Sequence, residues 1–190
     1  MVDLGIVILN WNTSALLKRC LETVYASQGD FSYQVVVVDN ASPDDSAAMV
    51  RRDFPQAQLI VSETNNGYSA GNNVGLRALG YKDKGRSPDA PRYALLLNPD
   101  TGVPTEGLRD MITFMDAQPK VGVAGPKLVL MDGSLDRACR RSFPTPLISL
   151  YHFSGLAKLF PNSPRFARYN MTYLPIDQEA EVDSVVGAYM

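Results

Sequence analysis

The chain has 190 residues, 45% of them hydrophobic, which is an ordinary composition for a globular protein with a sizeable core. Its formal net charge of −2 and its lack of a long basic run argue against nucleic-acid binding by phosphate neutralisation. Two cysteines far apart, Cys20 and Cys139, indicate neither a disulfide framework nor a zinc site. Since His152 is the only histidine, a Ser-His-Asp triad or a multi-histidine metal site would depend on that residue.

The N-terminal segment has Asp3 and only a short apolar run, so we predict no signal peptide. No stretch approaches the ~20 apolar residues of a membrane-spanning helix. We therefore expect a soluble, cytoplasmic domain.

Short apolar runs alternate with helical periodicity along residues 4–117. The apolar runs predict strands at Leu4–Leu9, Val35–Val38, Gln58–Val61 and Tyr93–Leu97. The periodic segments predict helices at Leu16–Tyr25, Asp44–Phe54, Ser69–Leu79 and Thr105–Ala117. This alternation predicts an α/β, Rossmann-like fold, with a mostly parallel central sheet flanked by helices on both faces.

The rest of the chain gives weaker signals. Two short runs, Val121–Ala124 and Lys127–Leu130, predict further strands, and the polar segment Lys82–Arg92 predicts a loop. For the apolar run Leu147–Phe160 we favour packing on the sheet over contact with a membrane surface, because it has one lysine and no basic face. Residues 182–190 resemble a strand that stops in mid-pattern, so we expect the natural protein to continue past Met190.

Polar residues follow each of the four main predicted strands. Ligands of open α/β sheets bind beyond the carboxyl ends of the strands. Asn, Asp, Ser and Gly gather at those ends in residues 10–12, 39–46, 65–75 and 98–101. The sequence therefore predicts a site for a polar ligand at this edge of the sheet.

Each of these segments also has a purely structural interpretation. Asp39 could accept a hydrogen bond from a nucleobase or a ribose, or it could cap the following turn. The Asn65–Gly75 stretch could bring backbone amides to a phosphate, or it could form a Gly/Asn-rich turn that caps a helix. It matches neither the G-x-G-x-x-G fingerprint nor a Walker A loop. Asp100 could hold Mg²⁺ or Mn²⁺ beside a diphosphate, or Asn98-Pro99-Asp100 could be a simple turn.

Four motifs in this order resemble family-2 glycosyltransferases of the GT-A fold. They are Ile-Leu-Asn-Trp-Asn, Val-Val-Asp-Asn-Ala-Ser-x-Asp-x-Ser, Asn-x-Gly-Tyr-x-x-Gly-x-Asn-x-Gly and Leu-Leu-Asn-Pro-Asp. The likeness is to the bacterial rhamnosyltransferase-like branch, which builds cell-surface polysaccharide, and it runs from about Gly5 to the end. Each motif alone is weak, but four of them on the right strand ends are a specific set.

The resemblance implies a role for each matching residue. Asp39 would contact a uracil or thymine base, and Asp100 would be the metal ligand of a DxD-type motif in which Asn98, near the ribose, replaces the first carboxylate. The other implied nucleotide-binding residues are Asn10, Asn12, Asn66, Gly67 and Asn72.

The resemblance further implies transfer, with inversion, from a dTDP- or UDP-linked sugar to a saccharide or lipid-linked acceptor, with rhamnose as one candidate sugar. Its cofactor would be Mg²⁺ or Mn²⁺, and its location the inner face of the plasma membrane. The family's general base belongs to a Glu-Asp-type motif downstream of Gly187–Ala188, so we expect it beyond Met190. Asp183 is the only nearby substitute. We therefore expect this chain to bind donor and to transfer sugar poorly.

We expect residues 1–190 to form one domain. Residues 1–100 would be its nucleotide-binding half and residues 101–190 the start of an incomplete acceptor half. A sugar nucleotidyltransferase is an alternative, but it would carry a Gly-rich basic loop where Asn10–Ser14 stands. A non-catalytic nucleotide-sugar-binding domain remains a second alternative.

Overall fold

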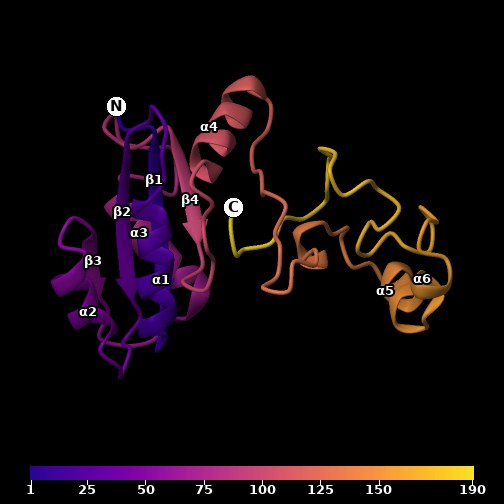
Figure 1. Cartoon of the computed structure of the whole chain (residues 1–190), viewed down its shortest axis with the longest axis horizontal. Helices are drawn as coiled ribbons and strands as arrows, with labels where there is room; N and C mark the ends of the chain where they lie inside the picture. Colours follow the sequence, from indigo (N-terminus) through magenta and orange to yellow (C-terminus); the bar gives the residue numbers. More distant parts are fainter. The chain divides into compact units, whose positions relative to one another are not determined.

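The computed structural model describes all residues, 1–190. Four parallel strands form one sheet in the order β3-β2-β1-β4 (Figure 1). Their bounds are β1 Leu4–Asn10, β2 Tyr33–Asp39, β3 Gln58–Val61 and β4 Tyr93–Leu97. The helices between and after them are α1 Ser14–Tyr25, α2 Ser46–Asp53, α3 Gly67–Ala78 and α4 Gly107–Ala117. The predicted α/β fold is confirmed, as are the elements predicted between residues 4 and 117.

The strand order reverses at β1, which explains the helices on both faces of the sheet. The chain runs outward from β1 through β2 to β3, and then crosses back to place β4 on the other side of β1. With right-handed crossovers, α1 and α2 cover one face of the sheet, and α3 covers the other (Figure 1). The reversal leaves the carboxyl ends of β1 and β4 at a topological switch point.

Glycines let α3 approach the sheet closely. A Cβ on Gly71 would overlap the side chain of Leu9, and one on Gly75 would overlap Val7. Val7 and Leu9 are alternate residues of β1, so they point to the same face. Val7 also belongs to a buried cluster with Val36, Val38 and Leu79 on that side.

The chain forms two compact units. The first comprises residues 1–122 and 187–189, and the second residues 123–186 and 190. The second unit contains one 3-10 turn, η1 Arg137–Cys139, and two short helices, α5 Pro146–Phe153 and α6 Leu156–Leu159.

The strands predicted at Val121–Ala124 and Lys127–Leu130 are absent, so that prediction was wrong. A single bridge joins Val129 to Leu135 across the tight turn at Asp132–Gly133. Val123 and Val129 are more than half exposed. An apolar run without a buried face or a longer pairing partner lacks what stabilises a strand.

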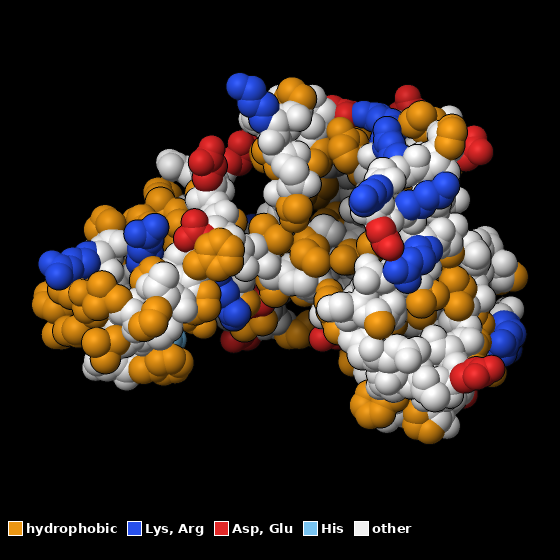
Figure 2. Space-filling view, turned by 180° about the vertical axis from the view of Figure 1, so that it is seen from behind, with side chains coloured by type: hydrophobic (Ala, Val, Ile, Leu, Met, Phe, Trp, Pro, Cys, Tyr) orange, Lys and Arg blue, Asp and Glu red, His pale blue; other side chains and the backbone are white.

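The apolar run at Leu147–Phe160 forms α5 and α6, but it is poorly packed. None of the eight residues of α5 is buried, so the expected burial of this run was wrong. Figure 2 shows hydrophobic side chains gathered at the surface of the lobe that holds α5 and α6. No helix in the structure is both long and apolar enough to cross a bilayer.

Candidate functional site

The first two strands end in a pair of buried polar residues. The register of β1 and β2 aligns Asn10 with Asp39, and their side chains are 0% and 2% exposed. The Asn10 amide Nδ2 donates to Asp39 Oδ1 and to Ser42 Oγ, each over 3.1 Å. Thr13 Oγ1 donates to Asn10 Oδ1 over 2.6 Å. Buried polar groups persist only when they are paired, so this cluster fixes the loops after both strands.

Asp39 caps its own turn, as the structural interpretation of this residue requires. Its Oδ2 accepts the backbone N–H of Ser42 over 3.1 Å. Ser42 also accepts, through Oγ, the backbone N–H of Asn12 over 2.9 Å, and Asn12 adopts a left-handed φ of 56°. Each Asp39 oxygen accepts one hydrogen bond, and a carboxylate oxygen can accept two. Turn capping therefore leaves acceptor capacity for a ligand donor.

Asp44 joins the starts of two helices. Its Oδ2 accepts the backbone N–H of Ser14, at the start of α1, and its Oδ1 accepts that of Ser46, at the start of α2, each over 3.0 Å. Burial raises the pKa of Asp44, but the hydrogen bonds from Ser46 and Ser14 outweigh it and lower the pKa below its ordinary value. The N-cap residue of α1, Thr13, makes no side-chain cap, so the capping acceptor comes from 30 residues away in the chain.

A buried asparagine that sequence analysis did not single out holds the β2 and β3 loops together. Asn40 is 2% exposed and donates through Nδ2 to Asn65 Oδ1 over 2.7 Å. In return Asn40 Oδ1 accepts the backbone N–H of Asn66 over 3.1 Å. Asn65 Oδ1 also accepts the N–H of Gly67 over 2.9 Å. The position of Asn40 directly after a buried strand was the available signal.

The start of α3 is therefore held beside the ends of β2 and β3. Asn66 is the N-cap residue of α3, and its side chain makes no capping hydrogen bond to the first-turn amides. The Gly67 N–H is taken by Asn65, so the amides left for an anionic group are those of the next residues of the first turn. Asn72, which is 4% exposed, donates through Nδ2 to the Tyr68 carbonyl, and Tyr68 donates its hydroxyl to the Gly187 carbonyl over 2.8 Å.

Residues 187–189 lie against the end of β4. Tyr189 forms an antiparallel bridge with Leu97, and the Asn98 N–H donates to the Ala188 carbonyl over 2.9 Å. Thr101 Oγ1 donates to the same carbonyl over 3.3 Å. This return of the chain holds the Asn98–Thr101 turn in place.

Asp100 is exposed, and its charge acts on Cys20 in the middle of α1. Burial raises the pKa of the Cys20 thiol to about 12, and the charge of Asp100 adds to this rise. Cys20 Sγ donates to the Asn98 carbonyl over 3.6 Å. The thiol is therefore neutral at neutral pH.

The residues present fit a metal that is held mainly by its substrate. No group of three or more His, Cys, Asp or Glu side chains could hold an ion by itself. Mg²⁺ commonly takes one or two carboxylates and completes its shell with water and substrate phosphates. One exposed carboxylate at Asp100 suits that mode of binding.

Asp183 has a structural partner within the second unit. Its Oδ2 accepts the backbone N–H of Phe143 over 3.2 Å, next to an antiparallel bridge between Arg141 and Ser184. These contacts give Asp183 a role in joining two segments of that unit.

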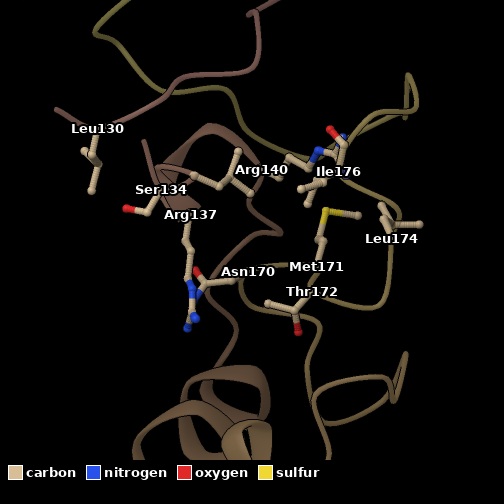
Figure 3. A pocket seen from close by; sticks show the side chains of 10 residues that line it. Leu130, Ser134, Arg137, Arg140, Asn170, Met171, Thr172, Leu174 and Ile176 are labelled. Atoms are coloured by element: carbon tan, nitrogen blue, oxygen red, sulfur yellow. The ribbon is translucent and has the colours of Figure 1, made fainter. Parts of the chain in front are cut away.

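The second unit also contains a pocket of about 520 Å³ (Figure 3). Its walls include the apolar Leu130, Met171 and Ile176, together with Arg137 and Arg140. Arg140 is engaged, because it donates to the carbonyls of Pro175, Ile176 and Gln178. Sequence analysis did not predict this pocket, since its residues come from two segments that no motif links.

Known proteins resemble this chain in sequence and in fold. The chain is 27% identical over 159 residues to the low-salt glycan biosynthesis hexosyltransferase Agl10 of Haloferax volcanii. That match covers 84% of this chain and 46% of Agl10, so the chain spans less than half the length of this relative.

Solved structures share the fold. The mannosyltransferase PcManGT from Pyrobaculum calidifontis, in complex with GDP-Man and Mn²⁺, superposes with a TM-score of 0.52 at 24% identity, over 66% of this chain and 36% of that one. S. aureus TarS superposes with a TM-score of 0.51 at 18% identity, over 73% of this chain and 27% of TarS.

The model of the glycosyl transferase family 2 matches residues 5–174, which is most of the chain. The motifs that carried the resemblance lie within these residues, at the ends of β1, β2, β3 and β4. The chain belongs to the glycosyl transferase family 2.

Proposed function

We propose that this chain binds the nucleotide-sugar donor of a glycosyltransferase, and that the site lies at the carboxyl ends of β1, β2 and β4. The buried pair Asn10–Asp39 is the observation that carries the proposal. Two polar side chains that are 0% and 2% exposed hold the adjoining loops in fixed positions at a topological switch point. Family membership and the Asn98–Asp100 motif agree with it.

The roles of the site residues follow from their surroundings. Asp39 accepts an N–H of the base through its remaining acceptor capacity, and the strand end at Asn10 and Asn12 lies beside that contact. Asn66, Gly67 and Asn72 place the start of α3 along the nucleotide or diphosphate, where uncapped amides stabilise negative charge.

Asp100 is the proposed metal ligand, and Asn98 is proposed to lie near the ribose. A bound Mg²⁺ or Mn²⁺ would neutralise charge on the diphosphate leaving group. PcManGT, whose structure contains Mn²⁺ and GDP-Man, supports this cofactor by likeness of fold.

The reaction that we propose is transfer of a hexose, with inversion, to a saccharide or lipid-linked acceptor. Rhamnose is the candidate that the motif pattern favours. The name of Agl10, a hexosyltransferase of glycan biosynthesis, supports the hexosyl class.

Calorimetric titration tests the donor site. The chain is titrated with UDP, dTDP and GDP, each with and without Mn²⁺. We expect one nucleotide to bind at least tenfold more tightly with Mn²⁺, because the metal links Asp100 to the diphosphate. Asp100→Asn should remove this gain, and Asp89→Asn, an exposed aspartate in the 82–92 loop, should keep it. A folded chain that binds none of the three nucleotides would contradict the proposal.

A further inference from the structure

The segment from Arg137 to Ile176 differs in charge from the rest of the chain. It holds six basic residues, Arg137, Arg140, Arg141, Lys158, Arg165 and Arg168, and no Asp or Glu. Since the whole chain has 18 basic and 20 acidic residues, the remainder holds 12 basic and all 20 acidic residues, a formal charge of −8. A net charge near zero thus conceals a strongly basic segment.

None of these six cations forms a salt bridge. Every salt bridge of the protein involves a Lys or Arg outside residues 137–176. Within the segment, Arg140 contacts backbone carbonyls and Arg165 stacks on Phe166. Lys158 and Arg168 are exposed and make no side-chain contact of this kind. Their charge is therefore available to an external anion.

Large apolar side chains of the same segment are open to solvent. Leu147, Leu150 and Phe153 of α5 are 55%, 59% and 81% exposed. At 100° per residue they share a face about 120° wide. Leu159 and Phe160 at the end of α6 are 70% and 46% exposed. Such a concentration is unusual for a surface that meets only water.

Basic and apolar side chains lie together on this lobe (Figure 2). We infer that α5 and α6, with Lys158 and Arg168, form a docking surface for an anionic phospholipid membrane. Exposed cations beside exposed aromatic and aliphatic residues suit such a membrane, because headgroup phosphates attract the cations while the apolar side chains enter the interface.

Other occupants fit less well. A second copy of the chain on a symmetric interface would bring Lys158 and Arg168 against the same two cations of its partner. A nucleic acid would use the cations but would leave the side chains of Leu150, Phe153 and Leu159 without an apolar partner. A lipid surface matches both features at once. The inference goes beyond the proposed function, because it uses none of the residues at the strand ends.

Vesicle co-sedimentation of the 190-residue chain tests the inference. We expect binding to vesicles of equal phosphatidylcholine and phosphatidylglycerol at low salt, much weaker binding to phosphatidylcholine alone, and release at 1 M salt. Lys158→Glu with Arg168→Glu should weaken binding about thirtyfold, since each cation near an anionic surface contributes about tenfold or less. The matched control is Lys82→Glu with Lys84→Glu, which makes the same change in net charge at two exposed lysines of the first unit. It should leave binding within about twofold.

A second pair of variants tests the apolar component. Phe153→Ser should weaken binding about tenfold, whereas Leu16→Ser, at an exposed position of α1, should have little effect. Circular dichroism establishes that each variant is folded. Three results would overturn the inference: no binding to anionic vesicles, equal weakening by both charge-reversed pairs, or a salt-sensitive dimer that Phe153→Ser dissociates while vesicles go unbound.

Discussion

The two compact units differ in where they place polar and apolar side chains. In the first unit, buried strands meet α1 and α3, and Lys18, Arg92 and Arg109 are among the cations in ion pairs. In the second unit only Cys139, Ala167 and Met171 are buried hydrophobic residues. The comparison teaches that overall composition hides function: polar residues are buried at the strand ends of one unit, and apolar residues are exposed on the helices of the other.

The largest expected effect contrasts two leucines. Leu21 of α1 is fully buried and Leu150 of α5 is 59% exposed. Leu21→Ala should lower the free energy of unfolding by about 3 kcal/mol, because it removes buried methyl groups and leaves a cavity. Leu150→Ala should change it by less than about 0.5 kcal/mol. Urea denaturation followed by circular dichroism measures both, and a similar loss for the two variants would refute the contrast.

A substitution at the contact of α3 with β1 should lower the free energy of unfolding by nearly as much. Gly75→Ala places a Cβ against Val7 in the packed sheet and should cost about 2 kcal/mol of unfolding free energy. Gly102→Ala is the control, because nothing lies within 4 Å of its added Cβ. If thermal denaturation ranks the two variants in the reverse order, α3 does not pack on β1 as described.

Asp44→Ala should cost about 1 kcal/mol of stability, since it removes one acceptor at the start of two helices. Its neighbour Asp45 is the matched control, because it is the N-cap residue of α2 but accepts no side-chain cap bond. Equal unfolding midpoints for Asp44→Ala and Asp45→Ala would show that the long-range cap is dispensable.

Acid should weaken the first unit through two of its carboxyl groups. Hydrogen bonds from Ser32 and Arg92 lower the pKa of Asp3 to about 2, and hydrogen bonds from Arg52 and Lys18 lower that of Asp53 to about 2. A carboxyl with a lowered folded-state pKa stabilises the fold above its unfolded value of 3.8, and this contribution is lost as the pH falls toward 2. Urea midpoints measured between pH 6 and pH 3 should therefore fall below pH 4, and less steeply in Asp3→Asn.

Much of the first unit could be predicted from sequence because periodicity and strand ends are local signals. The four valines before Asp39 predicted a buried strand. Asn10 aligns with Asp39 because both strands end at the same level of the sheet. The positions of polar residues at strand ends were predictable for the same reason.

The features that could not be predicted from sequence depend on long-range contacts. Asn40 holds Asn65 and Asn66, and Asp44 holds Ser14, across 25 or more residues, which no local pattern reveals. The strands expected at 121–130 failed because a short valine run needs a pairing partner. The exposed face of α5 was missed because an apolar run by itself does not show whether a neighbour covers it.

Hydrogen–deuterium exchange with and without nucleotide and Mn²⁺ tests the central claim most directly. The tightest-binding nucleotide from calorimetry is used at saturation. We expect slower exchange in residues 10–14, 39–46, 65–72 and 98–101, and unchanged exchange in α5 and α6. Protection confined to the pocket around Arg137 and Met171, with the strand ends unchanged, would contradict the assignment of the donor site.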